Sequence, residues 1–240
     1  MKKTYNNNEY NSMSLIEHLD ELRVRLFFVL FFFLIVTIIS FIEIKDIINL
    51  LQQPAYSIKF LQLAPGEFFF VSIKIALYLG LTFTSPFAIY QTILFILPGL
   101  TKKETVYIIP ILIGSVLLFF VGLIFSYIIL MPAALNFFIN YGSDIVEPLW
   151  SFEEYFNFIL LISFSTGISF QIPIIQILLG IFNIFSSEKM LYYWKYIFVS
   201  STIFSALVTP STDPITQISL SFALILLYFT SILVLKALKK

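Results

Sequence analysis

The side chains best suited to chemistry are concentrated in one short stretch, residues 14–26. This stretch contains the only histidine, both arginines and three carboxylates: Glu17, His18, Asp20, Glu21, Arg23 and Arg25. Residues 27–42, which follow directly, carry no charge, so the ionic patch lies at the foot of a membrane span. Such a patch can pair internally and anchor the span, or it can hold a charged partner where water meets lipid. From these residues alone both interpretations remain open.

The spacing within this stretch predicts a helix that continues into the membrane. Ser14 followed by Glu17 matches a capping box, which satisfies two backbone donors of a first helical turn. One apolar stripe is formed by Leu15, Leu19, Leu22 and Leu26. Glu17, Glu21 and Arg25 lie four residues apart, so their charged groups share another face and can pair. We therefore expect an amphipathic helix with carboxylate and guanidinium groups side by side.

The composition indicates a protein that crosses a membrane several times. Of 240 residues, 59% are hydrophobic and 12% are charged, and the mean hydropathy is +0.96. Segments of about 20 apolar residues recur, which is the length that a helix needs to cross a bilayer. No stretch shows the strict two-residue alternation of an outer-membrane barrel. We therefore predict an all-α polytopic membrane protein.

Several kinds of chemistry are excluded by residue type. The chain has no cysteine, which rules out disulfides, thiolate catalysis and iron–sulfur clusters, and one histidine cannot supply two imidazoles to a haem. No set of nucleophile, base and orienting group can be assembled, and no glycine-rich phosphate loop is present. The formal net charge of zero gives no argument for nucleic acid. We expect no enzyme, no cofactor, no metal and no nucleic-acid partner.

Six membrane spans are predicted within one domain, residues 14–240, after a disordered tail at residues 1–13. The spans are expected at residues 24–42, 69–97, 106–130, 155–182, 196–209 and 215–235. Because Pro132 follows the third apolar run, that span should end before it.

Three regions should depart from straight membrane-spanning helices. The loop at 43–67 mixes apolar and polar residues enough to form interfacial helices at 44–51 and 56–63. Pro86 should kink the second span, because proline removes a backbone donor. The fourth span should bend near its middle, where it contains Gly167, Gln171 and Pro173.

The basic residues divide unequally between the two sides of the membrane. Eleven fall in the termini and in every second loop, two fall in the alternate loops, and Lys74 lies inside a span. By the positive-inside rule both termini face the cytoplasmic or stromal side. The fifth span has 14 residues between Lys195 and Pro210, about 21 Å of helix against a hydrocarbon core of about 30 Å. We expect the last two spans to be short and the bilayer beside them to be thinned.

Two acidic residues at span edges have structural as well as functional explanations. Asp213 directly precedes Pro214, which fits an N-cap with proline at the first helical position. Glu104 can be a solvated loop charge beside Lys102 and Lys103.

Five motifs, met in order along the chain, together resemble one family. They are His-Leu-Asp-Glu-Leu-Arg-Val-Arg-Leu at 18–26, Ser-Pro-Phe-Ala-Ile-Tyr-Gln at 85–91, Phe-Ile-Leu-Pro-Gly-Leu at 95–100, Ser-Phe-Gln-Ile-Pro at 169–173 and Thr-Pro-Ser-Thr-Asp-Pro at 209–214. These look like TatC, the polytopic receptor subunit of the twin-arginine protein translocase, which also has six spans and both ends inside. The third and fifth motifs look most like the cyanobacterial and plastid branch.

The resemblance implies binding of signal peptides that carry two consecutive arginines, and transport of folded proteins driven by the proton-motive force. It places recognition of the arginine pair on Glu21 and Glu104, with Arg23 in the same motif as Glu21. A carboxylate suits this role because a guanidinium meets it with two parallel hydrogen bonds, which lysine cannot reproduce. Phe95 and Leu100 are similar to the apolar part of that site.

Further roles are implied by the same resemblance. Structural roles fall on Pro54, Phe69, Pro86, Pro98, Gly99 and Asp213. Contacts with single-span subunits of the TatA or TatB type fall on Gln171, Thr209 and Gln217, and each such interhelical bond is worth only about 0.6–2 kcal/mol. Gln171 stands where some bacterial members carry glutamate, which weakens any proton-relay role at that position.

The implied assembly is a homo-oligomer within a larger membrane complex, in the plastid thylakoid, with a bacterial or mitochondrial inner membrane as the alternative. A small-molecule or ion transporter is the main rival, because six spans with proline-broken helices suit it too. A transporter should show repeated halves and midplane charges, and the sequence shows neither. A structural subunit of an energy-converting complex is a second rival, which would co-purify with cofactor-bearing subunits.

Overall fold

The structure is a computed structural model that describes residues 15–55, 58–96, 102–141, 145, 147, 149–209 and 213–238, except for the side chains of 15, 16, 96 and 102–106. The tail predicted at residues 1–13 and the capping residue Ser14 lie outside the described residues. The first helix, α1 (Leu15–Ile42), is continuous from the charged patch to the end of the apolar segment. The prediction that the amphipathic start runs into the first span is therefore confirmed.

Within the described residues, five helical segments are long and apolar enough to cross a membrane, and a sixth apolar helix is shorter. The five are α1, α3 (Glu67–Ile96), α4 (Lys102–Phe125) continued through the π-helical turn η3 (Ser126–Leu130) into α5 (Met131–Tyr141), α6 (Phe152–Ser169) with α7 (Ile172–Ile181), and α10 (Pro214–Ala237). The shorter one is α9 (Trp194–Val208). The predicted all-α polytopic fold is confirmed.

Only one of the last two spans is short. Helix α9 has 15 residues, about 22 Å of helix, which does not match a hydrocarbon core of about 30 Å. Helix α10 has 24 residues, or about 36 Å, so the expectation that it too is short was wrong. It begins at Pro214 and runs past the predicted end to Ala237, because no residue in its last turns interrupts the helix.

The third span does not end before Pro132, which corrects the sequence prediction. The chain widens into the π-helical turn η3, where the backbone N–H of Met131 donates to the carbonyl of Ser126, five residues back. A proline ring in a regular α-helix collides with the carbonyl four residues earlier, and the wider turn relieves that collision. The helix therefore continues as α5 to Tyr141.

The fourth span is interrupted near its middle, as predicted, between α6 and α7. Phe170 and Gln171 separate the two helices, and the proline follows at 173, near the start of α7. Just before the break, Gly167 packs against Phe119 and Gly122 of α4, and a Cβ atom at Gly122 would lie 3.2 Å from the Cα of Gly167. The two glycines allow α4 and α6 to cross in close contact.

The loop after α1 contains one predicted interfacial helix and not the other. Helix α2 (Ile44–Gln52) matches the first, and a 3₁₀ turn, η1 (Gln53–Ala55), follows it. The second, expected at 56–63, is wrong within its described part. Strand β1 (Lys59–Leu61) instead pairs in parallel with β2 (Leu149–Ser151), with Phe60 opposite Trp150. A pairing partner about 90 residues away cannot be read from local periodicity.

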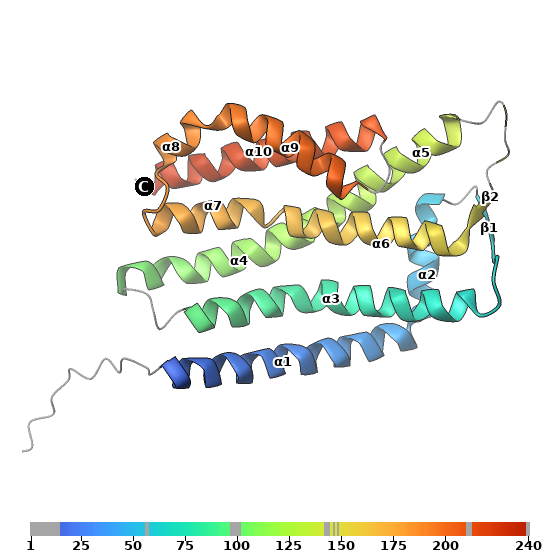
Figure 1. Ribbon diagram of the computed structural model, residues 1–240, viewed down its shortest axis with the longest axis horizontal. Helices are drawn as coiled ribbons and strands as arrows, with labels where there is room; N and C mark the ends of the chain where they lie inside the picture. The colour runs from blue at the N-terminus through green and yellow to red at the C-terminus, as the bar shows by residue number, and fades with distance from the viewer. Residues whose placement is uncertain are drawn as a thin grey trace, which may run out of the picture.

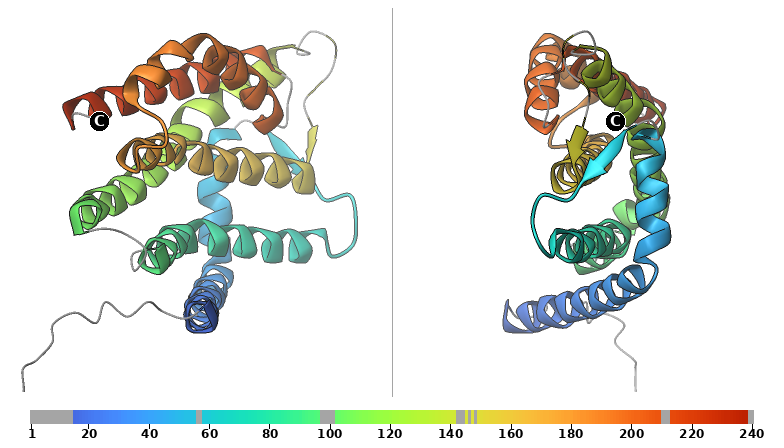
Figure 2. Two further views of the ribbon diagram at one scale, coloured as in Figure 1. Left: turned by 60° about the vertical axis from the view of Figure 1, so that its left-hand side comes forward. Right: turned by 90° about the vertical axis from the view of Figure 1, so that its right-hand side faces the viewer.

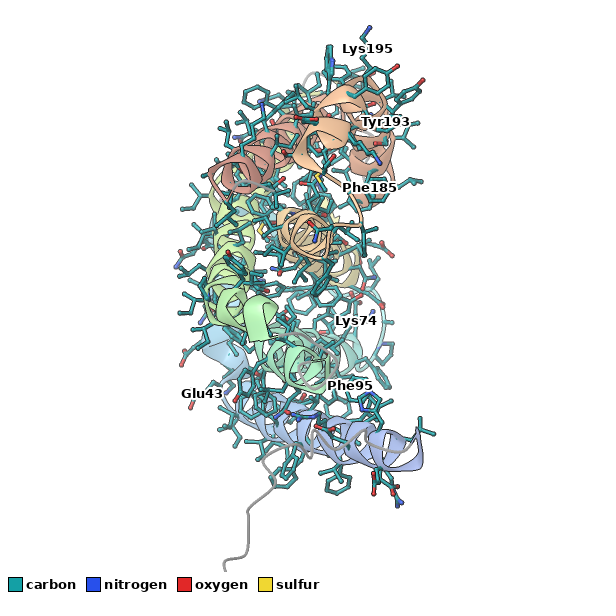
Figure 3. The ribbon with its side chains drawn as sticks, turned by 90° about the vertical axis from the view of Figure 1, so that its left-hand side faces the viewer. Glu43, Lys74, Phe95, Phe185, Tyr193 and Lys195 are labelled. Atoms are coloured by element: carbon teal, nitrogen blue, oxygen red, sulfur yellow. The ribbon has the colours of Figure 1, made fainter. Side chains whose placement is uncertain are left out.

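The helices form a curved wall rather than a closed ring. Helix α1 packs along α3 at one edge, and α8 (Ser187–Tyr192) with α9 lies at the other edge (Figure 2). Figure 3 shows the wall end-on, with Lys74 and Phe95 toward its concave side, Tyr193 and Lys195 at the edge far from Phe95, and Glu43 on the convex side. The largest buried cluster centres on α6, whose Phe156 and Ile159 pack with Ile75 of α3 and neighbouring helices.

The wall has two ends, which we name by what lies there. At the termini end, α1 begins, α3 ends, α4 begins and α10 ends (Figure 1). At the strand end lie β1, β2 and the start of α3 and α6 (Figure 1). Pro86, where a kink is predicted, lies inside α3, and the helix continues past it to Ile96. The carbonyl of Thr82, deprived of its proline donor, instead accepts a hydrogen bond of 2.8 Å from the hydroxyl of Ser85.

Candidate functional site

The charged patch at the termini end is built around the carboxylate of Glu21. Its Oε1 accepts a hydrogen bond from Nε of Arg25 at 2.9 Å and a second, shorter one from a terminal nitrogen of the same guanidinium. Both side chains are about one-fifth exposed, with 21% for Glu21 and 22% for Arg25. The remaining terminal nitrogen of Arg25 donates to Oε1 of Gln91 on α3 at 3.1 Å. The pairing expected from the four-residue spacing is therefore confirmed and extends to a second helix.

The second carboxylate oxygen of Glu21 is in a different situation. Its Oε2 is buried and receives no hydrogen bond within the part of the chain that the structure describes. Nδ1 of His18 lies 3.8 Å from it, and the His18 ring stacks on Phe95 with centroids 4.0 Å apart and planes 14° apart. A buried acceptor without a donor is costly, so this oxygen is an available site for a donor from another molecule.

The other residues implied for this site are only partly described. Arg23 is exposed on α1, and Phe95 lies in the last turn of α3 against His18. Glu104 lies in the first turn of α4, but its side chain is outside the described residues, as are Pro98, Gly99 and Leu100 entirely. The start of α4, the end of α3 and the start of α1 all lie at the termini end (Figure 1). The backbone thus brings the segments of Glu21, Phe95 and Glu104 to one end of the wall.

Comparison with known proteins now identifies the family. Residues 17–222 match the family model of the Sec-independent protein translocase protein (TatC). The chain belongs to the TatC family. The sequence is 52% identical to the Sec-independent protein translocase protein TatC of Synechocystis sp., over 92% of this chain and 87% of that protein. It is 48% identical to the chloroplastic TATC protein of Pisum sativum, over 90% of this chain and 62% of that protein.

The folds agree as well. The crystal structure of a twin-arginine translocase receptor, TatC, superposes with a TM-score of 0.79 at 33% identity, covering 93% of this chain and all of that one. This TatC chain is therefore a subunit of the twin-arginine translocase and an integral membrane protein of plastid or cyanobacterial type. The rival interpretation as a small-molecule or ion transporter is not supported.

Three TatC residues predicted to meet partner subunits make hydrogen bonds inside the chain. Oε1 of Gln171 accepts from the Ser115 hydroxyl at 2.6 Å, and its Nε2 donates to the Ser115 carbonyl at 3.1 Å, which ties α7 to α4. The Thr209 hydroxyl is buried and donates to the carbonyl of Ser205 at 2.9 Å. Gln217 reaches the carbonyl of Thr202 only at 3.4 Å. Of the three, Gln217 holds its internal partner most weakly.

The residues predicted to be structural occupy varied positions. Asp213 is the N-cap of α10, where its Oδ2 accepts from the backbone N–H of Thr216 at 2.8 Å and Pro214 follows. Pro54 lies in the turn η1. Phe69, in the first turn of α3, is about half exposed and contacts the Phe70 ring edge-on.

Sequence reasoning missed a second polar cluster, at the strand end of the concave side. Nζ of Lys74, labelled in Figure 3, donates to Oε1 of Glu153 at 2.9 Å and to Oδ1 of Asn157 at 2.8 Å, joining α3 to α6. Lys74 stood out in the sequence as the one basic residue inside a span. Glu153 and Asn157 lie four residues apart at the start of the fourth span, so they share one face of its helix. This spacing is the sequence feature that could have indicated them as partners of Lys74.

A buried carboxylate lies beside this cluster. Glu67, at the first position of α3, is 5% exposed. Its Oε2 accepts from the backbone N–H groups of Leu63 at 2.6 Å and Ala64 at 3.0 Å, and its Oε1 accepts from the N–H of Glu153 at 2.9 Å. The hydroxyl of Ser151 adds a longer contact of 3.5 Å. Glu67 therefore fastens the loop before α3 to the start of α6.

Proposed function

We propose that this chain recognises the arginine pair of twin-arginine signal peptides through Glu21 at the termini end of the wall. The observation that supports this most is the state of the Glu21 carboxylate, whose Oε2 is buried and accepts no hydrogen bond from any residue that the structure describes. A peptide guanidinium can satisfy that oxygen with a charge-assisted hydrogen bond, and partial desolvation strengthens it. The aromatic pair His18 and Phe95 borders the same carboxylate, so apolar residues beside the arginines have a surface to contact.

The remaining site residues enter the proposal from the family motifs. Glu104 supplies the second carboxylate, and its position in the first turn of α4 at the termini end is compatible with that role. Leu100 belongs to the apolar part of the site, and Pro98 and Gly99 have a structural role. Arg23 lies two residues from Glu21 on α1, with its guanidinium exposed.

The proposed partners include single-span subunits of the TatA or TatB type, which contact α9 and α10. A groove of about 340 Å³ lies between these helices and is lined by Phe198, Thr202, Gln217, Ile218, Ser221 and Phe222. Its polar members are flanked by apolar side chains, which suits a transmembrane helix that carries a hydrogen-bonding residue. Thr209 closes the end of α9, and Gln171 contributes by holding α7 on α4.

The proposed setting is the plastid thylakoid membrane, with both termini on the stromal side. Eleven basic residues in the terminal segments and in every second loop of the sequence, against two in the alternate loops, support this orientation. Residues 14–240 act there as one membrane domain, several copies assemble, and folded cargo is moved at the expense of the proton-motive force.

The test is binding of a synthetic twin-arginine signal peptide to the full chain in nanodiscs. The native peptide is compared with its Lys-Lys version on wild-type protein, Glu21→Ala, Glu104→Ala and the control Glu188→Ala. Glu188 is exposed on α8 at the termini end, so its substitution removes the same charge without touching Glu21. We expect an Arg-Arg preference that each site variant weakens by at least about tenfold, as for other buried charge contacts, and that Glu188→Ala leaves intact. Equal binding of the two peptides to wild-type protein would refute the proposal.

A further inference from the structure

We propose that Arg25 competes with the peptide arginines for the Glu21 carboxylate, and that Arg25 shifts its hydrogen bonds to Gln91 when a signal peptide binds. This inference rests on the proposed function of Glu21 and adds to it a cause of the selectivity for arginine over lysine. The inference is based on the hydrogen bonds of the Arg25 guanidinium, which donates both to Glu21 on α1 and to Gln91 on α3.

The contacts show that Glu21 is half occupied. Arg25 directs two donors, Nε and one terminal nitrogen, at the same oxygen, Oε1. Oε2 has no donor among the described residues. A guanidinium from outside can bind Oε2 once the side chains that cover this buried oxygen move aside, and it completes the two parallel bonds of a fork only after Arg25 gives up Oε1.

Gln91 offers Arg25 a second place. The other terminal nitrogen of Arg25 already donates to Oε1 of Gln91 at 3.1 Å, across from α1 to α3. A guanidinium carries five N–H donors in a rigid plane, so it can rotate toward Gln91 and solvent without losing every bond. Arg25 is one-fifth exposed, so the donors that leave Glu21 can be hydrated.

The exchange favours arginine over lysine for a geometric reason. The internal pair is a four-residue helix pair near the surface, a type that contributes little on its own, so it can be broken at small cost. An incoming arginine offsets that loss with its own two-pronged contact to the carboxylate. An incoming lysine offers a single ammonium, which does not replace the fork that it displaces. Displacing Arg25 from Glu21 therefore lowers the affinity for a lysine peptide more than the affinity for an arginine peptide.

The experiment measures the affinities of the Arg-Arg and Lys-Lys peptides for the full chain in nanodiscs, with four variants beside wild type. These are Arg25→Gln, Gln91→Leu, the double variant, and the control Lys195→Gln. Lys195 is exposed at the edge of the wall far from Phe95 (Figure 3), so its substitution removes one positive charge at a distance. Thermal unfolding of each variant checks that it is folded.

We expect Arg25→Gln to raise the affinity for the Lys-Lys peptide more than the affinity for the Arg-Arg peptide. The ratio of the Arg-Arg affinity to the Lys-Lys affinity should fall by about two- to fivefold, which corresponds to the free energy of a partly exposed ion pair. Gln91→Leu should weaken Arg-Arg binding, and this effect should vanish in the double variant because Arg25 is then absent. Lys195→Gln should leave the ratio unchanged.

Other results overturn the inference without ambiguity. If a folded Arg25→Gln protein loses Arg-Arg affinity, or keeps the wild-type ratio, Arg25 does not compete and only positions Glu21 or anchors α1. An equal effect of Gln91→Leu with and without Arg25 has the same meaning. Failure of the proposed function is recognised separately, because wild-type protein would then show no Arg-Arg preference and Glu21→Ala would change nothing.

Discussion

Two carboxylates at opposite ends of the wall are held in opposite ways. At the strand end, Glu67 is almost fully buried, and both of its oxygens accept hydrogen bonds from backbone N–H groups of two segments. At the termini end, one oxygen of Glu21 accepts from two donors of a single side chain, and the other has no donor among the described residues. A fully satisfied carboxylate joins elements of the fold, whereas a half-satisfied one at a water–lipid boundary can receive a ligand. The comparison separates a structural fastening from a binding site.

The largest effect should come from Glu67, and it should be on stability. In Glu67→Ala, three backbone N–H groups lose their acceptor where the loop before α3 meets the start of α6. We expect a loss of about 2–4 kcal/mol in the free energy of unfolding, because buried donors are left unpaired. Thermal unfolding of the detergent-solubilised protein measures it. The matched control is Glu154→Ala, whose exposed side chain lies one residue from Glu153 and should change stability by less than about 0.5 kcal/mol.

The result would also sharpen the comparison through peptide binding. The folded fraction of Glu67→Ala should bind an Arg-Arg peptide as wild type does, because Glu67 lies at the strand end and Glu21 at the termini end. If Glu67→Ala were as stable as Glu154→Ala, Glu67 would not be a structural residue, and the contrast between Glu67 and Glu21 would be wrong.

A smaller effect is expected at the neighbouring ion pair. Lys74 and Glu153 are 34% and 47% exposed, so their attraction is screened and worth little by itself. Lys74→Met should cost about 1 kcal/mol, since Glu153 then keeps its charge at the membrane boundary without a partner. Adding Glu153→Gln should recover part of that loss, and the double-mutant cycle in thermal unfolding measures the coupling. Additive effects would show that the two residues act independently.

Sequence reasoning reached the parts of this molecule that depend on local pattern. The long apolar runs gave the helical spans, the proline and glycine near Gln171 gave the break in the fourth, and the spacing of Glu21 and Arg25 gave their pairing. Each of these follows from residues within a few turns of one another. The same locality explains why Asp213 could be placed as a cap before its geometry was known.

The failures occurred where distant segments determine the outcome. Strand β1 forms because Phe60 and its neighbours pair with β2. The centroid of the Phe60 ring lies 4.7 Å from that of the Tyr155 ring. Pro132 is tolerated because a π-helical turn precedes it, and nothing in the local pattern announces that turn. Gln91, now the second acceptor for Arg25, was part of a motif in the sequence but had no role until α3 was placed beside α1.

The smallest effect on stability is expected at Glu21, and it tests the comparison most directly. Glu21→Ala removes a helix pair worth about 0.3–0.5 kcal/mol and also removes a buried oxygen that has no donor among the described residues, so the two contributions oppose each other. We expect the unfolding temperature to stay within the range of the Glu154→Ala control while Arg-Arg binding falls. That outcome would show that the Glu21 carboxylate serves peptide binding rather than stability. A loss of stability as large as that of Glu67→Ala would instead place Glu21 among the structural fastenings of the wall.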